Sequence, residues 1–311
     1  MPPPSAHQPQ KHRNKTRKIG SKGKKNHQPP PGPSQCHPSL KVAAAHGCLP
    51  LAVLRRVAKQ VGVNPRAQGP ALRSQLEVAL HVKPGAERSF LMALPIAAQE
   101  KTDLARSYLR PAAPAAWAAD PDMWLDSNNI AAVLNQYEDA YPDFEFMGPF
   151  PIDFAAPDPY IGGMGGAGAA AAGAQPKCLM NEICELRVQK AMAAGTRAIG
   201  IVYNLDPHFK SGSHWVANFI DLAKHRCYYM DSYGYEPPPQ IARFMKWLTT
   251  QDPKMRLEYN SRRLQHQNTE CGMYSIYFII RMLLGDKFQQ FTRRRPTDAE
   301  MMDLRDWLFS V

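Results

Sequence analysis

Three short apolar runs and one longer run in the C-terminal part of the chain most constrain what it can fold into. The short runs are rich in β-branched and aromatic residues, which is typical of buried strands, and they are AIGIVYNLD (198–206), HWVANFID (214–221) and RCYYMDSYG (226–234). The longer run, residues 271–284, has the length of a helix, and Gly285 stops it. Together they predict an α+β fold in which a small mixed sheet is flanked by helices.

The charge of the chain is concentrated near its N-terminus. Residues 1–76 contain 14 Lys and Arg but no Asp or Glu, so the formal net charge of +11 comes from this part and the remainder is nearly neutral. Residues 1–40 have almost no apolar side chains to bury, and we expect them to form a disordered basic tail. The eight Lys and Arg of residues 11–25 fit DNA or an acidic partner, a nuclear-targeting signal, or a solubilising tail.

Residues 41–110 are expected to form a basic, mostly helical N-terminal arm. Apolar residues recur at helical spacing in two stretches between positions 47 and 82, with basic residues on the outer face. This pattern resembles small SAP-like DNA-binding modules, but it equally fits an arm that positions substrate or simply packs against the body. A Pro/Ala-rich linker at 111–121 separates the arm from a second domain at 122–311, and residues 160–176 read as a Gly/Ala-rich mobile insert.

Several classes of protein are disfavoured. No apolar run is long enough for a membrane span, and the N-terminus lacks the apolar core of a secretory signal. The six cysteines contain no CxxC pair, so a reducing, intracellular compartment fits best. The spacing of four potential metal ligands matches no standard zinc site, and no cofactor is expected; these four are Cys36, His37, His46 and Cys48.

The predicted hairpin suggests a pair of interacting side chains. If its turn centres on Leu222 and Ala223, antiparallel pairing places His214 opposite Asp231. A carboxylate beside an imidazole can fix its tautomer and stabilise the imidazolium. Taken singly, each of these residues is more often structural than catalytic.

Cys271 directly precedes the long apolar helix. The free N–H groups and the positive end of the helix dipole favour a thiolate there, whereas most cysteines in such a place are buried and inert. Gly272 leaves room for a substrate, and a thiolate next to an imidazolium can attack a carbonyl group. Gln265 and the backbone N–H of Cys271 could then donate hydrogen bonds to the developing oxyanion.

The order and spacing of these residues resemble those of the ubiquitin-like-protein-specific cysteine proteases, the Ulp/SENP and adenovirus-protease superfamily. The resemblance covers about residues 122–285 and rests on HWV (214–216), MDSYG (230–234) and QHQNTECG (265–272). It implies a papain-like, Ulp-type core. The chain departs from the family pattern at Gln267, where Asn is frequent, and at Glu270, where Asp is frequent.

The resemblance also implies roles for individual residues. His214 would be the base, Asp231 would orient it, Cys271 would be the nucleophile and Gln265 would line the oxyanion hole. Two aromatic residues would line the substrate cleft, Trp124 and Trp215.

The basic arm and the overall size resemble those of the large DNA virus branch, of the African swine fever virus and iridovirus type. The implied function is cleavage after Gly-Gly or Gly-Xaa, in viral structural polyproteins during virion maturation. Alternatives are maturation or deconjugation of a SUMO-like modifier, an acyltransferase with the same triad, and a DNA-binding scaffold with a degenerate protease domain. We expect a monomer in the host cytoplasm and virion, with the nucleus as an alternative. The sequence IGGMGGA (161–167) is a candidate self-cleavage site, although a flexible insert explains it more simply.

Overall fold

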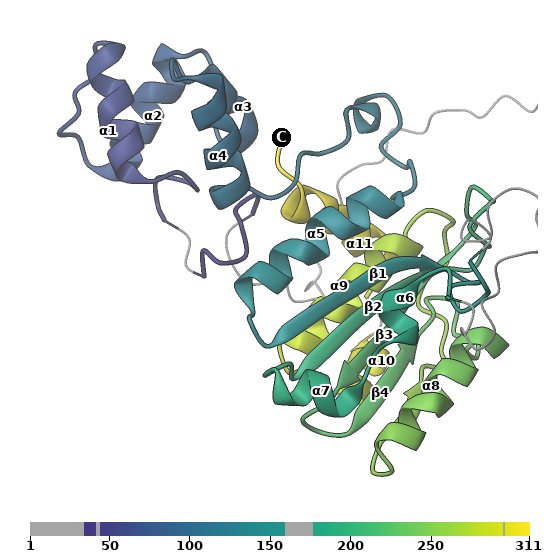
Figure 1. The fold of residues 1–311 in the computed structure, drawn as a ribbon. Coiled ribbons are helices and arrows are strands. Elements are labelled where there is room, and N and C mark those ends of the chain that lie inside the picture. The colour runs from purple at the N-terminus through teal and green to yellow at the C-terminus, as the bar shows by residue number, and fades with distance from the viewer. Residues whose placement is uncertain (1–33, 42–43, 159–176, 295) are drawn as a thin grey trace, which may run out of the picture.

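The computed structural model describes residues 34–41, 44–158, 177–294 and 296–311 (Figure 1). The predicted basic tail up to residue 33, the whole Gly/Ala insert and the candidate self-cleavage site lie outside the described residues. No helix within the described part is long and apolar enough to cross a membrane.

A mixed five-stranded sheet forms the centre of the C-terminal body, with strands in the order β1-β2-β3-β4-β5. The outer strands pair in parallel with their neighbours and the inner three pair antiparallel. The strands are β1 (Phe144–Pro151), β2 (Ala198–Asn204), β3 (Trp215–Asp221), β4 (Arg226–Met230) and β5 (Arg256–Tyr259). The three apolar runs of the sequence thus form the three consecutive inner strands β2, β3 and β4, as predicted.

Helices cover both faces of this sheet (Figure 1), which explains why six consecutive residues of β2 and of β3 are buried rather than every second one. One face carries α5 (Ser127–Ala140), α9 (Cys271–Leu283), α10 (Phe288–Arg294) and α11 (Asp298–Leu308). The other face carries α6 (Asn181–Cys184), α7 (Val188–Ala193) and α8 (Pro239–Gln251). Three residues, 185–187, separate the two short helices α6 and α7.

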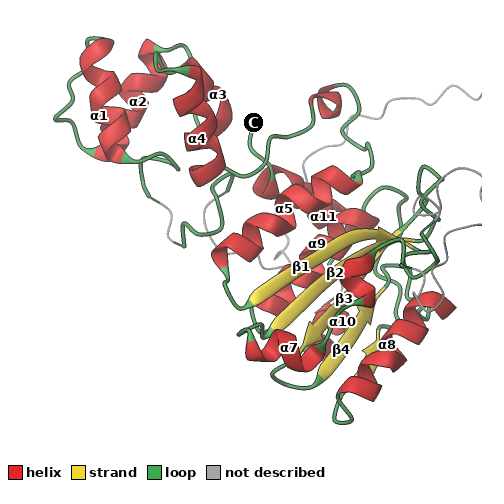
Figure 2. Ribbon diagram, in the orientation of Figure 1, coloured by secondary structure: helices red, strands yellow, loops and turns green. Residues whose placement is uncertain are grey.

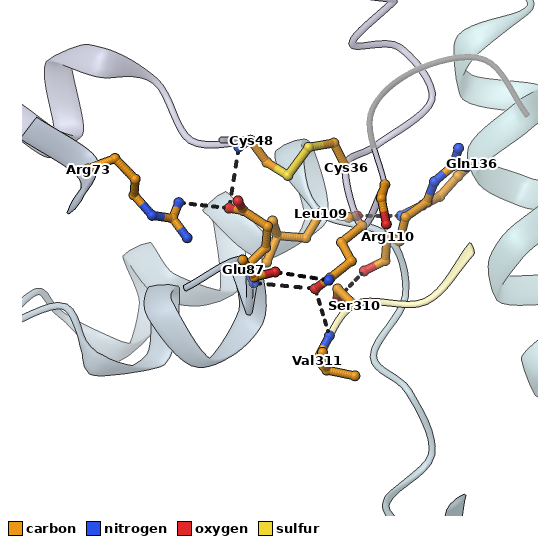
Figure 3. Close-up of a disulfide and its surroundings, with 12 residues drawn as sticks. Cys36, Cys48, Arg73, Glu87, Leu109, Arg110, Gln136, Ser310 and Val311 are labelled. Atoms are coloured by element: carbon orange, nitrogen blue, oxygen red, sulfur yellow. Dashed lines mark hydrogen bonds and ion pairs between the residues drawn. A yellow bond between two sulfur atoms is a disulfide. The ribbon is translucent and has the colours of Figure 1, made fainter. Parts of the chain in front are cut away.

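The N-terminal arm has a hydrophobic core of its own. Its helices are α1 (Leu51–Gln60), α2 (Gly69–Ala79), α3 (Glu87–Ala93) and α4 (Ala98–Tyr108), of which the sequence predicted the first two. A buried ion network crosses this core: Arg73 donates to Glu77 at 2.8 Å and to Glu87 at 3.0 Å. Figure 3 shows the contact with Glu87. A single-turn 3-10 helix (Ala115–Ala118) lies in the segment between arm and body.

Hydrogen bonds join the arm to the end of the body (Figure 3). The Arg88 side chain donates to Ser310 Oγ at 2.8 Å and to the Arg110 carbonyl at 2.9 Å. The Oε1 atom of Gln35 accepts from the backbone N–H groups of Glu87 and Val311. The domain boundaries drawn from the sequence stay predictions, but these contacts show that the segments on both sides of the linker are in direct contact.

Four of the six cysteines form disulfides, Cys36–Cys48 and Cys178–Cys184. This disagrees with the expectation of a reducing compartment, because disulfides persist mainly under oxidising conditions. The lack of a CxxC motif did not exclude them, since folding brings together cysteines 12 and 6 positions apart. Cys36 and Cys48 are thus bonded to each other, and no cluster of potential metal ligands occurs among the described residues.

Candidate active site

Three elements meet at one end of the sheet, where loops gather (Figure 2). His214 directly precedes β3, and Asp231 directly follows the antiparallel strand β4. Cys271 is the first residue of α9, which packs against β3. Residues far apart in the sequence therefore come together because each lies at the boundary of an element.

The hairpin register differs from the prediction by two residues. Ala217 pairs with Met230 and Asp221 with Arg226, so the turn centres one residue later than expected. The left-handed backbone of His225, with φ of 55°, helps to close this four-residue loop. His214 is consequently diagonal to Asp231 rather than directly opposite, yet its Nε2 atom lies 2.8 Å from Asp231 Oδ1.

Asp231 is held in place from several directions. It is 1% exposed, and its Oδ1 atom also accepts from the backbone N–H of Tyr233 at 2.8 Å. The side chain of Asn260 bridges the backbone of Asp231, accepting from its N–H at 2.9 Å and donating to its carbonyl at 2.7 Å. The carboxylate that orients His214 is thus itself fixed before any substrate arrives.

His214 contacts both Asp231 and Cys271. Burial by itself lowers the pKa of the ring, but the hydrogen bonds and charges of Asp231 and Cys271 more than compensate and raise it to about 9. Because Nε2 is taken by Asp231, Nδ1 is the ring nitrogen left for the sulfur. The ring of Tyr233 stacks on the imidazole with centroids 4.7 Å apart. At neutral pH this arrangement favours an imidazolium beside the sulfur.

Cys271 is 2% exposed at the head of α9. A Cβ atom added at Gly272 would lie 3.1 Å from the side chain of Leu125, so the segment containing Leu125 packs closely against this helix end. The N–H groups of the first helical turn have no partners within the helix, and they create a positive potential at the sulfur. The site is therefore electrostatically suited to a thiolate and sterically narrow.

Gln265 is fully buried beside this group. Its Oε1 atom accepts from Ser232 Oγ at 2.6 Å, and its backbone N–H donates to the Ser232 carbonyl at 2.9 Å. Its Nε2 atom donates one hydrogen to the Gln267 carbonyl at 3.0 Å. The amide orientation is thus fixed, and the second Nε2 hydrogen has no protein acceptor among the described residues.

The two tryptophans expected in the substrate cleft differ in exposure. Trp124 is 42% exposed, whereas Trp215 is 7% exposed and donates through Nε1 to the Leu125 carbonyl at 2.9 Å. Trp215 therefore supports the segment that carries Trp124 and offers little surface of its own.

Both departures from the family pattern fit this site. Gln267 contributes its carbonyl to Gln265, which does not depend on its side chain. The Glu270 carboxylate accepts from the N–H and hydroxyl of Thr269.

Sequence reasoning missed the residues that support the site, Tyr233, Asn260, Ser232 and Leu125. Asn260 lies five residues before Gln265 and Leu125 directly follows Trp124, but neither carries a local signal for the contact it makes. Ser232 and Tyr233 belong to the MDSYG motif, but only the fold reveals what they contact.

Parts of the chain are similar to known cysteine proteases. Residues 203–309 match the family model described as Ulp1 protease family, C-terminal catalytic domain. A putative thiol protease of Acanthamoeba polyphaga mimivirus is 31% identical over 196 residues, which cover 60% of this chain and 56% of that protein. A SUMO-1 cysteine protease of an African swine fever virus isolate is 33% identical over 130 residues, or 39% of this chain and 47% of that protein. The chain thus spans about half the length of the curated relatives it matches.

The crystal structure of the African swine fever virus protease has the same fold. Its TM-score is 0.60 at 18% identity, and the match covers 91% of this chain and 98% of the viral one. This likeness shows a shared fold, and residues 203–309 are similar to the catalytic domain of the Ulp1 protease family. The curated relatives named above are proteins of large DNA viruses, which favours that branch.

Proposed function

We propose that this protein is a cysteine endopeptidase that acts through Cys271, His214 and Asp231. The observation that carries the proposal is the contact of His214 with both Asp231 and Cys271, which raises the pKa of the imidazole to about 9. A protonated ring at neutral pH can stabilise a thiolate and later deliver its proton to a leaving group.

In this mechanism the Cys271 thiolate attacks the scissile carbonyl, and the electron pair moves to the carbonyl oxygen. The backbone N–H of Cys271 and the uncommitted Nε2 hydrogen of Gln265 stabilise the oxyanion. The tetrahedral intermediate collapses, the C–N bond breaks, and His214 gives its proton to the leaving amine. His214 then takes a proton from water, whose hydroxide attacks the thioester and releases the acid and the thiolate. Asp231 holds the ring in orientation throughout.

The substrate in this proposal carries a Gly-Gly or Gly-Xaa pair before the cleaved bond. Two features support a preference for small residues: Cys271 is only 2% exposed, and Leu125 packs within van der Waals contact of Gly272. A side chain next to the cleaved bond would have to displace this packing. Structural polyproteins of a large DNA virus are the substrates we favour, with processing in host cytoplasm and virion.

Labelling by a peptide electrophile tests the activity. A Gly-Gly vinyl sulfone should modify Cys271, and His214→Ala should abolish the reaction. The other free cysteine supplies a matched control: Cys227 is fully buried and burial raises the pKa of its thiol, so Cys227→Ala should label normally. Labelling that persists in Cys271→Ala would contradict the proposal.

A SUMO-like modifier is the second candidate substrate, because a viral relative is described as a SUMO-1 cysteine protease. Cleavage of a SUMO precursor can be compared with cleavage of Gly-Gly-Xaa peptides from viral polyproteins at equal enzyme concentration. The better substrate by kcat/KM identifies the natural class. Transfer of an acetyl group from acetyl-CoA to Cys271, without peptide cleavage, would instead indicate an acyltransferase.

We also propose that the arm binds DNA or an acidic partner and concentrates the enzyme on its substrates. Arg55 and Lys59 are exposed on α1, while Arg56 pairs with Glu100 of α4. Each phosphate contact contributes about −0.9 to the slope of log affinity against log salt concentration. In the double variant Arg55→Gln, Lys59→Gln, the slope should therefore become less negative by about two. An unchanged slope would exclude α1 from the interface.

A further inference from the structure

A second concave site lies on the face of the sheet opposite to α9. It is a cavity of about 620 Å³ between α6, α8 and the loop that follows β1. Figure 1 shows α6 and α8 on the same side of the sheet. Cavities of this size hold small ligands or the side chains of a bound peptide.

Aromatic rings line this cavity. Phe154 meets Phe244 edge-to-face with centroids 6.2 Å apart, and Phe244 lies 6.0 Å from Trp247 in a tilted arrangement. Phe154 and Phe244 are nearly inaccessible from outside, whereas Trp247 is half-buried. Such a surface suits a bulky apolar side chain, which would replace water on the exposed part of Trp247.

Positive charge surrounds the aromatic floor. Arg187 approaches Trp247 from the α6–α7 link, with its guanidinium carbon 5.9 Å from the ring centroid. Arg243 lies one turn before Trp247 on α8, is exposed, and makes no hydrogen bond or ion pair within the described residues. The single carboxylate in the lining, Asp153, is already bonded to the backbone N–H and ring of His208. The net charge facing a ligand is therefore positive.

The wall that carries Arg187 is fixed in place. Arg187 Nη1 donates to the Leu186 carbonyl at 3.0 Å, and Gln251 of α8 donates to the same carbonyl at 3.2 Å. Gln251 also accepts from the N–H of Val188 at 3.0 Å. The cavity is consequently formed before a ligand binds, and binding needs little ordering of the protein.

We propose that this cavity binds a linear peptide segment in which a bulky aromatic or aliphatic residue is flanked by acidic residues. The apolar side chain lies in the cavity against the surface lined by Phe154, Phe244 and Trp247. Its acidic neighbours pair with Arg187 and Arg243, which lie at two different places around the rings. The site is remote from Cys271, and the proposal does not rest on peptidase activity.

NMR titration of the full-length Cys271→Ala protein tests the site without cleavage of the probe. The probe is acetyl-Asp-Phe-Asp-amide, compared with acetyl-Asn-Phe-Asn-amide and acetyl-Asp-Ala-Asp-amide. The reporter is the Trp247 indole N–H, assigned by its loss in Trp247→Phe. A partly exposed ion pair is worth about threefold in affinity, so the acidic peptide should bind about tenfold tighter than the neutral one.

Charge variants separate a specific site from general attraction. Arg243→Gln should weaken the acidic peptide about threefold and leave the neutral one unchanged. Arg293→Gln, which removes an exposed charge on α10, should change neither. Equal affinity for the acidic and neutral peptides would overturn the proposal, as would equal affinity for the Phe and Ala peptides. Chemical-shift changes that leave the Trp247 indole signal unaffected would also overturn the proposal.

Discussion

Replacing Asp231 with asparagine removes one negative charge from the site while keeping its shape. Asparagine can still accept hydrogen bonds from His214 and from the N–H of Tyr233, so the fold should persist. The rise in the His214 pKa from 6.5 to about 9 corresponds to about 3 kcal/mol favouring the imidazolium. Loss of an opposite charge in direct contact should lower that pKa by about one to three.

The assay is a pH titration of the histidine Cε1–H signals by NMR, with His214 assigned by the His214→Gln variant. The wild-type ring should titrate near pH 9, and the Asp231→Asn ring should titrate between about pH 6 and 8. Alkylation of Cys271 by iodoacetamide at pH 7.5 should slow in parallel, because less imidazolium stabilises the thiolate.

A second histidine–carboxylate pair provides the control. His225 Nδ1 lies 2.6 Å from Asp252 Oδ2, and β3 and β4 separate this pair from His214 along the hairpin. Asp252→Asn should therefore leave the His214 titration unchanged. A His214 pKa near 6.5 in the wild type, or one that stays near 9 in Asp231→Asn, would contradict the role of Asp231.

The raised pKa of His214 also makes the stability of the folded protein depend on pH. The folded-state pKa of His214 is raised, so its contribution to the free energy of unfolding is fully present below pH 6.5. The contribution declines as pH rises and is lost above about 9, where the folded protein also releases the proton. Denaturant unfolding should show that wild type loses more stability than Asp231→Asn between these pH values.

Three further predictions concern the surroundings of the site and the arm. Gly272→Ala places a Cβ atom 3.1 Å from Leu125 and should slow labelling by the Gly-Gly electrophile, whereas the companion variant Leu125→Ala should restore it. Gln265→Ala should lower kcat by about 10²- to 10³-fold with little change in KM if the amide stabilises the oxyanion, and an equal loss in kcat and thiol alkylation would contradict this role. Cys36→Ser opens a disulfide that spans 12 positions and should destabilise the arm by about 3 kcal/mol in denaturant unfolding. In the presence of a reducing agent, wild type and Cys36→Ser should have the same free energy of unfolding.

Much of the site was predictable because its residues lie at element boundaries that the sequence marks. Apolar runs define β3, β4 and α9, and His214, Asp231 and Cys271 stand at their ends. The predicted pairing of β3 with β4 was wrong by two residues. The length of a hairpin loop depends on backbone conformations such as that of His225, which the sequence does not reveal. The diagonal contact survived this error because a side chain can reach a neighbour two positions along the facing strand.

The sequence alone determined the hydrophobic pattern that produces a covered mixed sheet, and it placed a cysteine at a helix head and a histidine and an aspartate at strand ends. Only the tertiary structure decided how these groups are supported, through Asn260, Ser232 and Leu125, since such contacts depend on long-range packing that leaves no local pattern. It also decided the disulfides and the cavity beside α8, because both arise from segments that become neighbours only after the chain has folded.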